Sequence, residues 1–389
     1  MELEDFAGRE LAQRRALGLT RRLRWLDGSQ QPWVNVDGRR ALLLCSNNYL
    51  GLATHPAVCE AARRAAEECG VGAGASRLVS GSMRLHQALE EQLAAWKGTE
   101  AALLFNSGYH ANVGVIPALV GSDDAVFSDA LNHASIVDGC RLSHARVVVY
   151  PHRDAAALEA RLARSAARRR LVVTESIFSM DGDTAPLAAI CDAAERHGAM
   201  VMVDEAHATG IVGPHGGGVV EAEGLQNRVT VQMGTLGKAL GTFGAFVAGR
   251  RGVIDLLINT ARSFIYTTAL PPPVVGAALA ALRIVTSDPA PRQRLAENAA
   301  TLHRELQRLG LQAGATPAHI IPVVIGDPSR TMCLSERLLA QGVFVQGIRP
   351  PTVPAGTARL RVTLMSTHTP ADLRFATEAF QHVMTAEPR

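Results

Sequence analysis

The chain has 389 residues, of which 47% are hydrophobic and 19% charged, and its formal net charge is +3. This composition supports a large buried core, and the length favours two domains. The small net charge gives no reason to expect a nucleic-acid partner. No apolar run approaches the roughly 20 residues that a membrane helix needs, so we expect no membrane partner.

The first residues, Met1 to Asp5, are acidic and lack the basic and apolar regions of a signal peptide. The six cysteines show neither the C-x-x-C spacing of redox and zinc motifs nor a small disulfide framework. They are typical of reduced thiols in a cytosolic enzyme, which predicts a cytoplasmic protein without a metal site.

Residues 1–45 are expected to form an N-terminal arm that begins with a polar helical pattern. This arm carries several arginines, Arg21 among them, and these form either a solvated basic face or a site for an anionic substrate. Asn47 and its neighbour then occupy a plausible turn. A helix follows, with Pro56 just inside its start, and runs to about Cys69.

A glycine-rich segment, 70–77, follows this helix and includes Ser76. No strand precedes it, so it is not a dinucleotide-binding fingerprint. Its small side chains suggest close backbone approach to a ligand or to a second subunit. Further on, Ser107, Gly108 and Tyr109 lie where a strand runs into a helix. The free amides there form either a phosphate site or an ordinary strand-to-helix turn.

Seven apolar runs alternate with helical segments, and they are centred near residues 103, 126, 148, 172, 202, 231 and 246. The alternation predicts a large α/β domain over 46–274 with a seven-stranded, mostly parallel sheet. Polar segments follow five of these strands, at the edge where open α/β sheets bind ligands. We therefore expect the functional site at the carboxyl ends of the strands.

Two of these segments carry the clearest chemistry. Lys238 lies among glycines between two predicted strands, and a lysine amine condenses with aldehydes once its pKa is lowered by burial. A P-loop is excluded because Gln232 and Ala239 replace the required glycine and Ser/Thr. Asp204 ends a buried strand and needs a cationic partner, which a protonated pyridine nitrogen would be. Together they predict a pyridoxal phosphate site.

Residues 275–389 are expected to form a smaller C-terminal α/β domain after Pro271–Pro273. In its last predicted strand, 359–364, strict alternation places Arg359, Arg361 and Thr363 on one face. The two arginines are either solvated or part of a clamp that binds a carboxylate.

Six segments carry a resemblance to a known family: SNNYLGL (46–52), LVSGSMRLHQALEEQLA (78–94), LNHAS (131–135), FSMDGD (178–183), VDEAHATG (203–210) and TLGKALG (235–241). They resemble the α-oxoamine synthases, fold-type I pyridoxal phosphate-dependent transferases that condense an amino acid with an acyl-CoA. The resemblance covers nearly the whole chain, to about His368. It implies a large seven-stranded sheet domain with a smaller C-terminal domain.

A further segment, IRPPTVPAGTARLRVTL (348–364), narrows the resemblance. Its Arg-Pro-Pro favours the member of biotin biosynthesis that uses L-alanine and a pimeloyl thioester, on coenzyme A or an acyl carrier protein. The glycine-using members, which make aminolevulinate or aminoketobutyrate, usually lack it. They stay open as alternatives, because 128–141 also resembles the aminolevulinate synthases. A non-catalytic pyridoxal-binding sensor domain is a third reading, although this chain has no room for an attached DNA-binding module.

The resemblance implies a role for each cofactor residue. Lys238 binds the cofactor aldehyde, Asp204 pairs with the pyridine nitrogen, and His207 hydrogen-bonds the phenolic oxygen. His133 stacks over the ring, although a histidine in such a sequence context is more commonly a capping or core residue. The cofactor, mainly its phosphate, is held by Ser107, Gly108, Tyr109, Ser179 and Thr235.

The resemblance also implies a homodimer, because Thr267 and Thr268 correspond to residues that reach the cofactor of the neighbouring subunit. Ser76 stands where aminolevulinate synthases typically carry threonine, so it leaves room for the methyl group of alanine; otherwise it only caps a turn. The remaining substrate residues are Asn47 and Arg361 for the amino acid carboxylate, and Arg21 and Thr352 for the acyl substrate.

Overall fold

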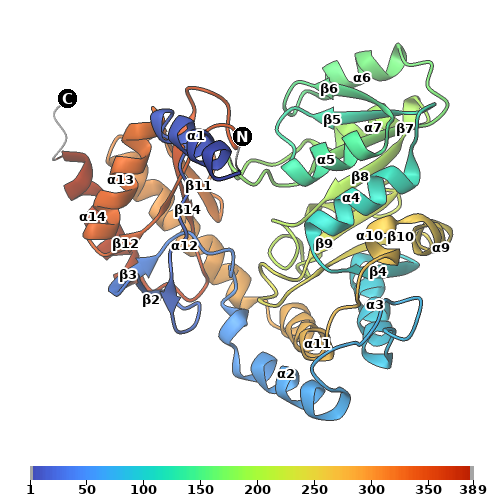
Figure 1. The fold of residues 1–389 in the computed structure, drawn as a ribbon, viewed down its shortest axis with the longest axis horizontal. Helices are drawn as coiled ribbons and strands as arrows, with labels where there is room; N and C mark the ends of the chain where they lie inside the picture. The colour runs from blue at the N-terminus through green and yellow to red at the C-terminus, as the bar shows by residue number, and fades with distance from the viewer. Residues whose placement is uncertain (1–2, 386–389) are drawn as a thin grey trace. The chain divides into compact units, whose positions relative to one another are not determined.

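The structure is a computed structural model that describes residues 3–385 (Figure 1). It divides into two compact units, which we describe separately. Unit 1 comprises the described residues up to 49, residues 180–182 and those from 293 onward. Unit 2 comprises residues 50–179 and 183–292. Among the described helices, none is both long and apolar enough to cross a membrane.

Unit 2 is built on a seven-stranded sheet with the strand order β4-β10-β9-β8-β7-β5-β6. Strands β5 to β9 pair in parallel, whereas β10 pairs antiparallel with both β4 and β9. All seven predicted strands are therefore present, and the sheet is mostly parallel as expected. The strands are β4 (Ala101–Phe105), β5 (Ala125–Asp129), β6 (Arg146–Tyr150), β7 (Arg170–Glu175), β8 (Met200–Asp204), β9 (Val231–Thr235) and β10 (Ala245–Gly249).

Helices connect the strands of unit 2 except for β9 and β10, which are joined by a loop (Figure 1). The predicted helix that starts at Pro56 is α2, which ends at Cys69 as expected. The helices of this unit are η1 (Leu52–Thr54), α2 (Pro56–Cys69), α3 (Arg84–Lys97), α4 (Gly108–Leu119), α5 (Ala134–Leu142), α6 (Ala155–Ala163), α7 (Leu187–Arg196), α8 (Val219–Ala222), α9 (Arg251–Thr260), α10 (Arg262–Ile265) and α11 (Pro272–Ser287).

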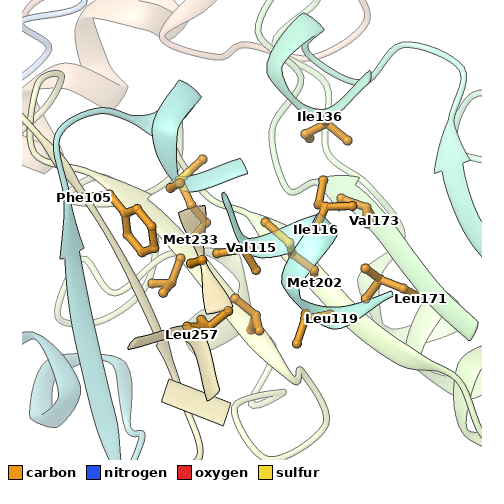
Figure 2. Packing of buried hydrophobic residues seen from close by; sticks show 14 of the residues in the cluster. Phe105, Val115, Ile116, Leu119, Ile136, Leu171, Val173, Met202, Met233 and Leu257 are labelled. Carbon is orange, nitrogen blue, oxygen red and sulfur yellow. The ribbon is translucent and has the colours of Figure 1, made fainter. Parts of the chain in front are cut away.

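Both faces of this sheet are buried. Figure 2 shows Val115 and Leu119 of α4 packed with Met202 of β8 on one face. The alternate residues of β8 belong to a second cluster on the opposite face, with Leu158 of α6 and Ile190 of α7. A strand that is buried on both faces has a nearly continuous apolar sequence, which explains why these runs identified the strands.

Unit 1 contains two smaller sheets, β1-β2-β3-β12 and β11-β14-β13. Strand β3 pairs in parallel with β12, which joins the N-terminal segment to the C-terminal part of the chain. The elements of this unit are α1 (Leu3–Ala16), β1 (Leu26–Asp27), β2 (Trp33–Val36), β3 (Arg39–Leu43), α12 (Ala290–Arg308), β11 (Ile320–Gly326), α13 (Pro328–Ala340), β12 (Val343–Phe344), β13 (Gln346–Ile348), β14 (Ala358–Thr363) and α14 (Pro370–Thr385).

The compact units do not follow the domain boundaries predicted from the sequence. The segment predicted as an N-terminal arm, 1–45, groups with the C-terminal residues because β3 pairs with β12. Helix α11, which begins within the triple proline, groups with unit 2 because it packs against α2 and α3. The boundaries at 45/46 and 274/275 stay a prediction about domains, distinct from this division by contacts.

Candidate active site

Asp204 ends β8 and is only 4% exposed. Its Oδ1 accepts a hydrogen bond from the Ala206 N–H at 2.9 Å, and its Oδ2 accepts one from Asn112 Nδ2 of α4, also at 2.9 Å. Both of these donors are uncharged. A buried carboxylate without a counter-charge is costly. The site therefore fits a ligand that brings a positive charge, such as a protonated pyridine nitrogen.

Lys238 lies in the loop after β9, and its Nζ is 2.8 Å from His207 Nε2. The loop is tight: the Gly241 N–H donates to the Lys238 carbonyl at 2.9 Å. Gly241 has a φ of 66°, and a Cβ there would lie 2.2 Å from the Ala53 nitrogen, so only glycine fits. The structure thus brings together the predicted aldehyde-binding lysine and the predicted phenolate partner.

The chain has only two lysines, and the other one, Lys97, cannot react with an aldehyde because it is buried in an ion pair. Lys97 is fully buried and forms an ion pair with Glu205, which follows Asp204 directly. Its Nζ also donates to the Gly217 carbonyl. Lys238 is therefore the only half-buried lysine amine in the protein that can react with an aldehyde.

The amino terminus of α4 provides the predicted phosphate donors. Ser107 caps this helix, since its Oγ accepts from the His110 N–H at 3.2 Å, and Gly108 and Tyr109 are the first two helical residues. Their backbone N–H groups have no partner within the helix, which makes this end suitable for an anion. Thr235 ends β9, and its Oγ1 accepts from the Gly237 N–H at 3.2 Å.

The loop with Thr267 and Thr268 lies next to the amino terminus of α4 in the same chain. Asn106 Nδ2 donates to Thr267 Oγ1 at 3.0 Å and to the Thr268 carbonyl at 2.9 Å. Ser76 forms a backbone bridge with Thr268, so the glycine-rich segment reaches this place too. The predicted reach of both threonines into a neighbouring subunit stays a prediction.

His133 caps α5, with its Nδ1 accepting from the Ser135 N–H at 3.2 Å. The capping alternative is therefore correct, and because His133 remains exposed, a stacking role is compatible with it. Ser179 follows β7 and is 7% exposed. Its N–H donates to Oε2 of Glu175 at 3.2 Å, and the His133 N–H donates to Oε1 of the same residue at 2.7 Å. The sequence analysis missed Glu175, although its place at a strand's carboxyl end was a usable signal.

In unit 1, Arg361 of β14 donates to Asn47 Oδ1 at 3.3 Å. The Tyr49 hydroxyl donates to the same oxygen at 2.9 Å, and Tyr49 is fully buried. Arg359 on the same strand pairs with Asp181. Both arginines are buried, at 7% and 4% exposed, so the solvated alternative is wrong. The structure brings the two predicted carboxylate-binding residues together and adds Tyr49, which the sequence analysis missed.

Unit 1 also holds a cavity of about 430 Å³ that Arg21 and Thr352 both line. Arg349, the arginine of the Arg-Pro-Pro segment, lines it as well and is 9% exposed. Burial and the nearby Arg21 lower the pKa of Arg349 below its usual value. Part of the remaining lining is apolar: Met332, Leu339, Phe344 and Ile348. This combination suits a ligand with an apolar chain and an anionic end.

Residues 39–380 match the family model of aminotransferase class I and II. The chain belongs to this family. It is 53% identical over 380 residues to a protein of Geotalea daltonii named 8-amino-7-oxononanoate synthase, with 97% of each chain covered. It is 55% identical over 377 residues to the protein of the same name from Geobacter sulfurreducens, with 96% of each chain covered.

Solved structures agree with this placement. Serine palmitoyltransferase from S. paucimobilis with a bound PLP–myriocin aldimine superposes with a TM-score of 0.95, at 35% identity and 99% coverage of both chains. The 8-amino-7-oxononanoate synthase of Francisella tularensis gives a TM-score of 0.76 at 26% identity, over 89% of this chain and 98% of that one. The predicted fold-type I architecture and the resemblance to 8-amino-7-oxononanoate synthase are confirmed.

Proposed function

We propose that this chain is a pyridoxal phosphate-dependent 8-amino-7-oxononanoate synthase of biotin biosynthesis. It condenses L-alanine with a pimeloyl thioester and releases carbon dioxide and a thiol. The observation that carries the proposal is the joint presence of Lys238, hydrogen-bonded to His207, and a buried Asp204 that accepts hydrogen bonds from two uncharged donors. The relatives of the same name, at 53% and 55% identity, support the reaction.

The donor set fits pyridoxal phosphate. This cofactor, when bound, supplies an aldehyde that takes up an amino group and a ring that withdraws electrons from the α-carbon. Lys238 would bind the aldehyde and Asp204 the protonated ring nitrogen. Ser107 and the free amides at the start of α4 would hold the phosphate, because an anion is stabilised at a helix amino terminus.

The amine of Lys238 is the proposed base that removes the α-proton of alanine, a task for which a positioned amine close to a histidine is suited. The α-carbon then forms a bond with the acyl carbon while the carbon–sulfur bond breaks and the thiol leaves. The alanine carboxyl group then leaves as carbon dioxide, and protonation of the α-carbon completes the reaction. Arg361 and Asn47 are proposed to bind the alanine carboxylate before it leaves.

The cavity of unit 1 is proposed to take the distal carboxylate of the pimeloyl chain. Arg21 and Arg349 supply positive charge, Thr352 a hydroxyl group, and the apolar lining suits the methylene groups. We also propose a homodimer in the cytoplasm, with Thr267 and Thr268 serving the neighbouring subunit. The function is tested by thiol release from pimeloyl, succinyl and acetyl thioesters, each with alanine and with glycine.

Ser76 is expected to set the preference for alanine over glycine. Threonine at this position adds a methyl group that would crowd the alanine side chain. A methyl-sized space changes specificity by about 10- to 200-fold, so Ser76→Thr should shift kcat/KM toward glycine by that order. Thiol release by both proteins with both amino acids gives the ratio. An unchanged ratio would mean that Ser76 only caps its turn, and a wild-type preference for glycine would favour the glycine-using synthases.

A further inference from the structure

Glu175 is a buried acid to which the proposed reaction gives no role. It ends β7 and is 2% exposed. Its two carboxylate oxygens accept hydrogen bonds from two different loops. Oε1 accepts from the His133 N–H at 2.7 Å, in the loop after β5, and Oε2 accepts from the Ser179 N–H at 3.2 Å, in the loop after β7. A single side chain therefore holds the backbone of two residues expected to contact the cofactor.

Glu175 is itself fixed relative to the strand that carries Asp204. The two residues are register partners in the neighbouring parallel strands β7 and β8. The Glu175 N–H donates to Asn132 Oδ1 at 3.2 Å, and Asn132 Nδ2 donates back to the Val173 carbonyl of β7 at 2.8 Å. Glu175 therefore links both loops to the carboxyl ends of β7 and β8.

The surroundings of Glu175 disfavour its charged form. Burial and the nearby Asp204 raise the pKa of Glu175 above its usual value. Lys238 and the two backbone N–H donors lower this pKa. An acid placed beside another acid in a buried site is costly unless its oxygens are satisfied, and here each oxygen takes one N–H. The two hydrogen bonds are therefore the interactions that allow Glu175 to stay in this position.

We propose that Glu175 is a positioning residue for the cofactor site. By holding the His133 and Ser179 N–H groups, it sets the positions of the stacking imidazole and of the Ser179 side chain relative to Asp204. The inference rests on the proposed cofactor, but not on the acyl substrate or on the amino acid. It is therefore tested with pyridoxal phosphate alone.

The variant Glu175→Gln keeps the shape of the side chain but replaces one oxygen by an NH₂ group, which cannot accept a hydrogen bond. Either the partly buried His133 N–H or the buried Ser179 N–H then loses its acceptor. We expect the dissociation constant for pyridoxal phosphate to rise by about 10-fold or more. We also expect the visible circular dichroism of the bound cofactor to change, because that signal reports how the ring is held.

Asp124→Asn is the matched control. Asp124 is 1% exposed and also accepts two backbone N–H groups, from Gly121 at 2.9 Å and from Arg169 at 3.1 Å. Asp124 immediately precedes β5, so it lies at the amino ends of the parallel strands, whereas Glu175 lies at their carboxyl ends. This variant should lower the unfolding midpoint while leaving the dissociation constant and the dichroism of the cofactor at wild-type values.

Three outcomes decide the proposal. A cofactor signal altered in Glu175→Gln but not in Asp124→Asn supports it, whereas equal signals in the two variants and the wild type overturn it. If Glu175→Gln does not fold, Glu175→Asp takes its place, because it keeps the carboxyl group but shortens the side chain by one methylene group. Wild-type cofactor binding and dichroism in Glu175→Asp would overturn the proposal. A wild-type protein that takes up no pyridoxal phosphate would instead overturn the proposed function.

Discussion

Turnover is expected to fall by about 10³-fold or more when Lys238 is replaced by alanine, because the variant loses both the amine that binds the cofactor and the proposed base. No other lysine can take its place, because Lys97 is the only other one and it is fully buried against Glu205. The measurement is kcat from thiol release at saturating substrates. Residual activity within about 10-fold of the wild type would contradict the assignment of the base.

The same residue can be identified chemically. Borohydride reduction of the wild-type protein with pyridoxal phosphate should fix the cofactor on one lysine, and peptide mapping has only two to distinguish, Lys97 and Lys238. We expect the label on the peptide with Lys238. A label on Lys97 would show that the site has been placed on the wrong amine, and Lys238→Ala serves as the unlabelled control.

Asp204→Asn is expected to have the second-largest effect, with kcat lower by about 10²- to 10³-fold. A neutral amide stabilises a positive charge on the ring nitrogen much less than a carboxylate does. Its NH₂ group would also face one of the two present donors, either Asn112 Nδ2 or the Ala206 N–H. Exchange of the α-proton of alanine in D₂O, followed by NMR, measures the affected step without an acyl substrate.

The matched control for this variant is again Asp124→Asn, which removes a buried carboxylate at the amino ends of the parallel strands, away from Asp204. It should leave the exchange rate per folded molecule unchanged. If Asp204→Asn exchanges the α-proton as fast as the wild type, Asp204 does not act on the ring nitrogen.

The sheet of unit 2 was predictable because its strands are buried on both faces and therefore appear as continuous apolar runs. The run centred near residue 246 corresponds to β10, which spans Ala245–Gly249. Strands β1 to β3 were not predicted. They are two to five residues long, and β3 begins with two exposed arginines, so its sequence lacks the alternation that identifies a half-buried strand.

The central residues of the site were predictable because they follow buried strands, whose carboxyl ends meet at one edge. Lys238, Asp204 and His207 were found this way or through the resemblance. Asn112 was not, because nothing in the sequence of α4 shows that its side chain faces Asp204. Tyr49 was missed for a similar reason: its contact with Asn47 depends on the local turn rather than on a pattern of residue types.

The proposed condensation is tested most directly by following the carboxyl carbon of alanine. The purified protein is incubated with pyridoxal phosphate, pimeloyl-CoA and L-alanine labelled with ¹³C in the carboxyl group, and the products are analysed by mass spectrometry. We expect unlabelled 8-amino-7-oxononanoate and an equal amount of labelled carbon dioxide. An amino ketone that retains the label, or a condensation that proceeds with glycine and not with alanine, would contradict it.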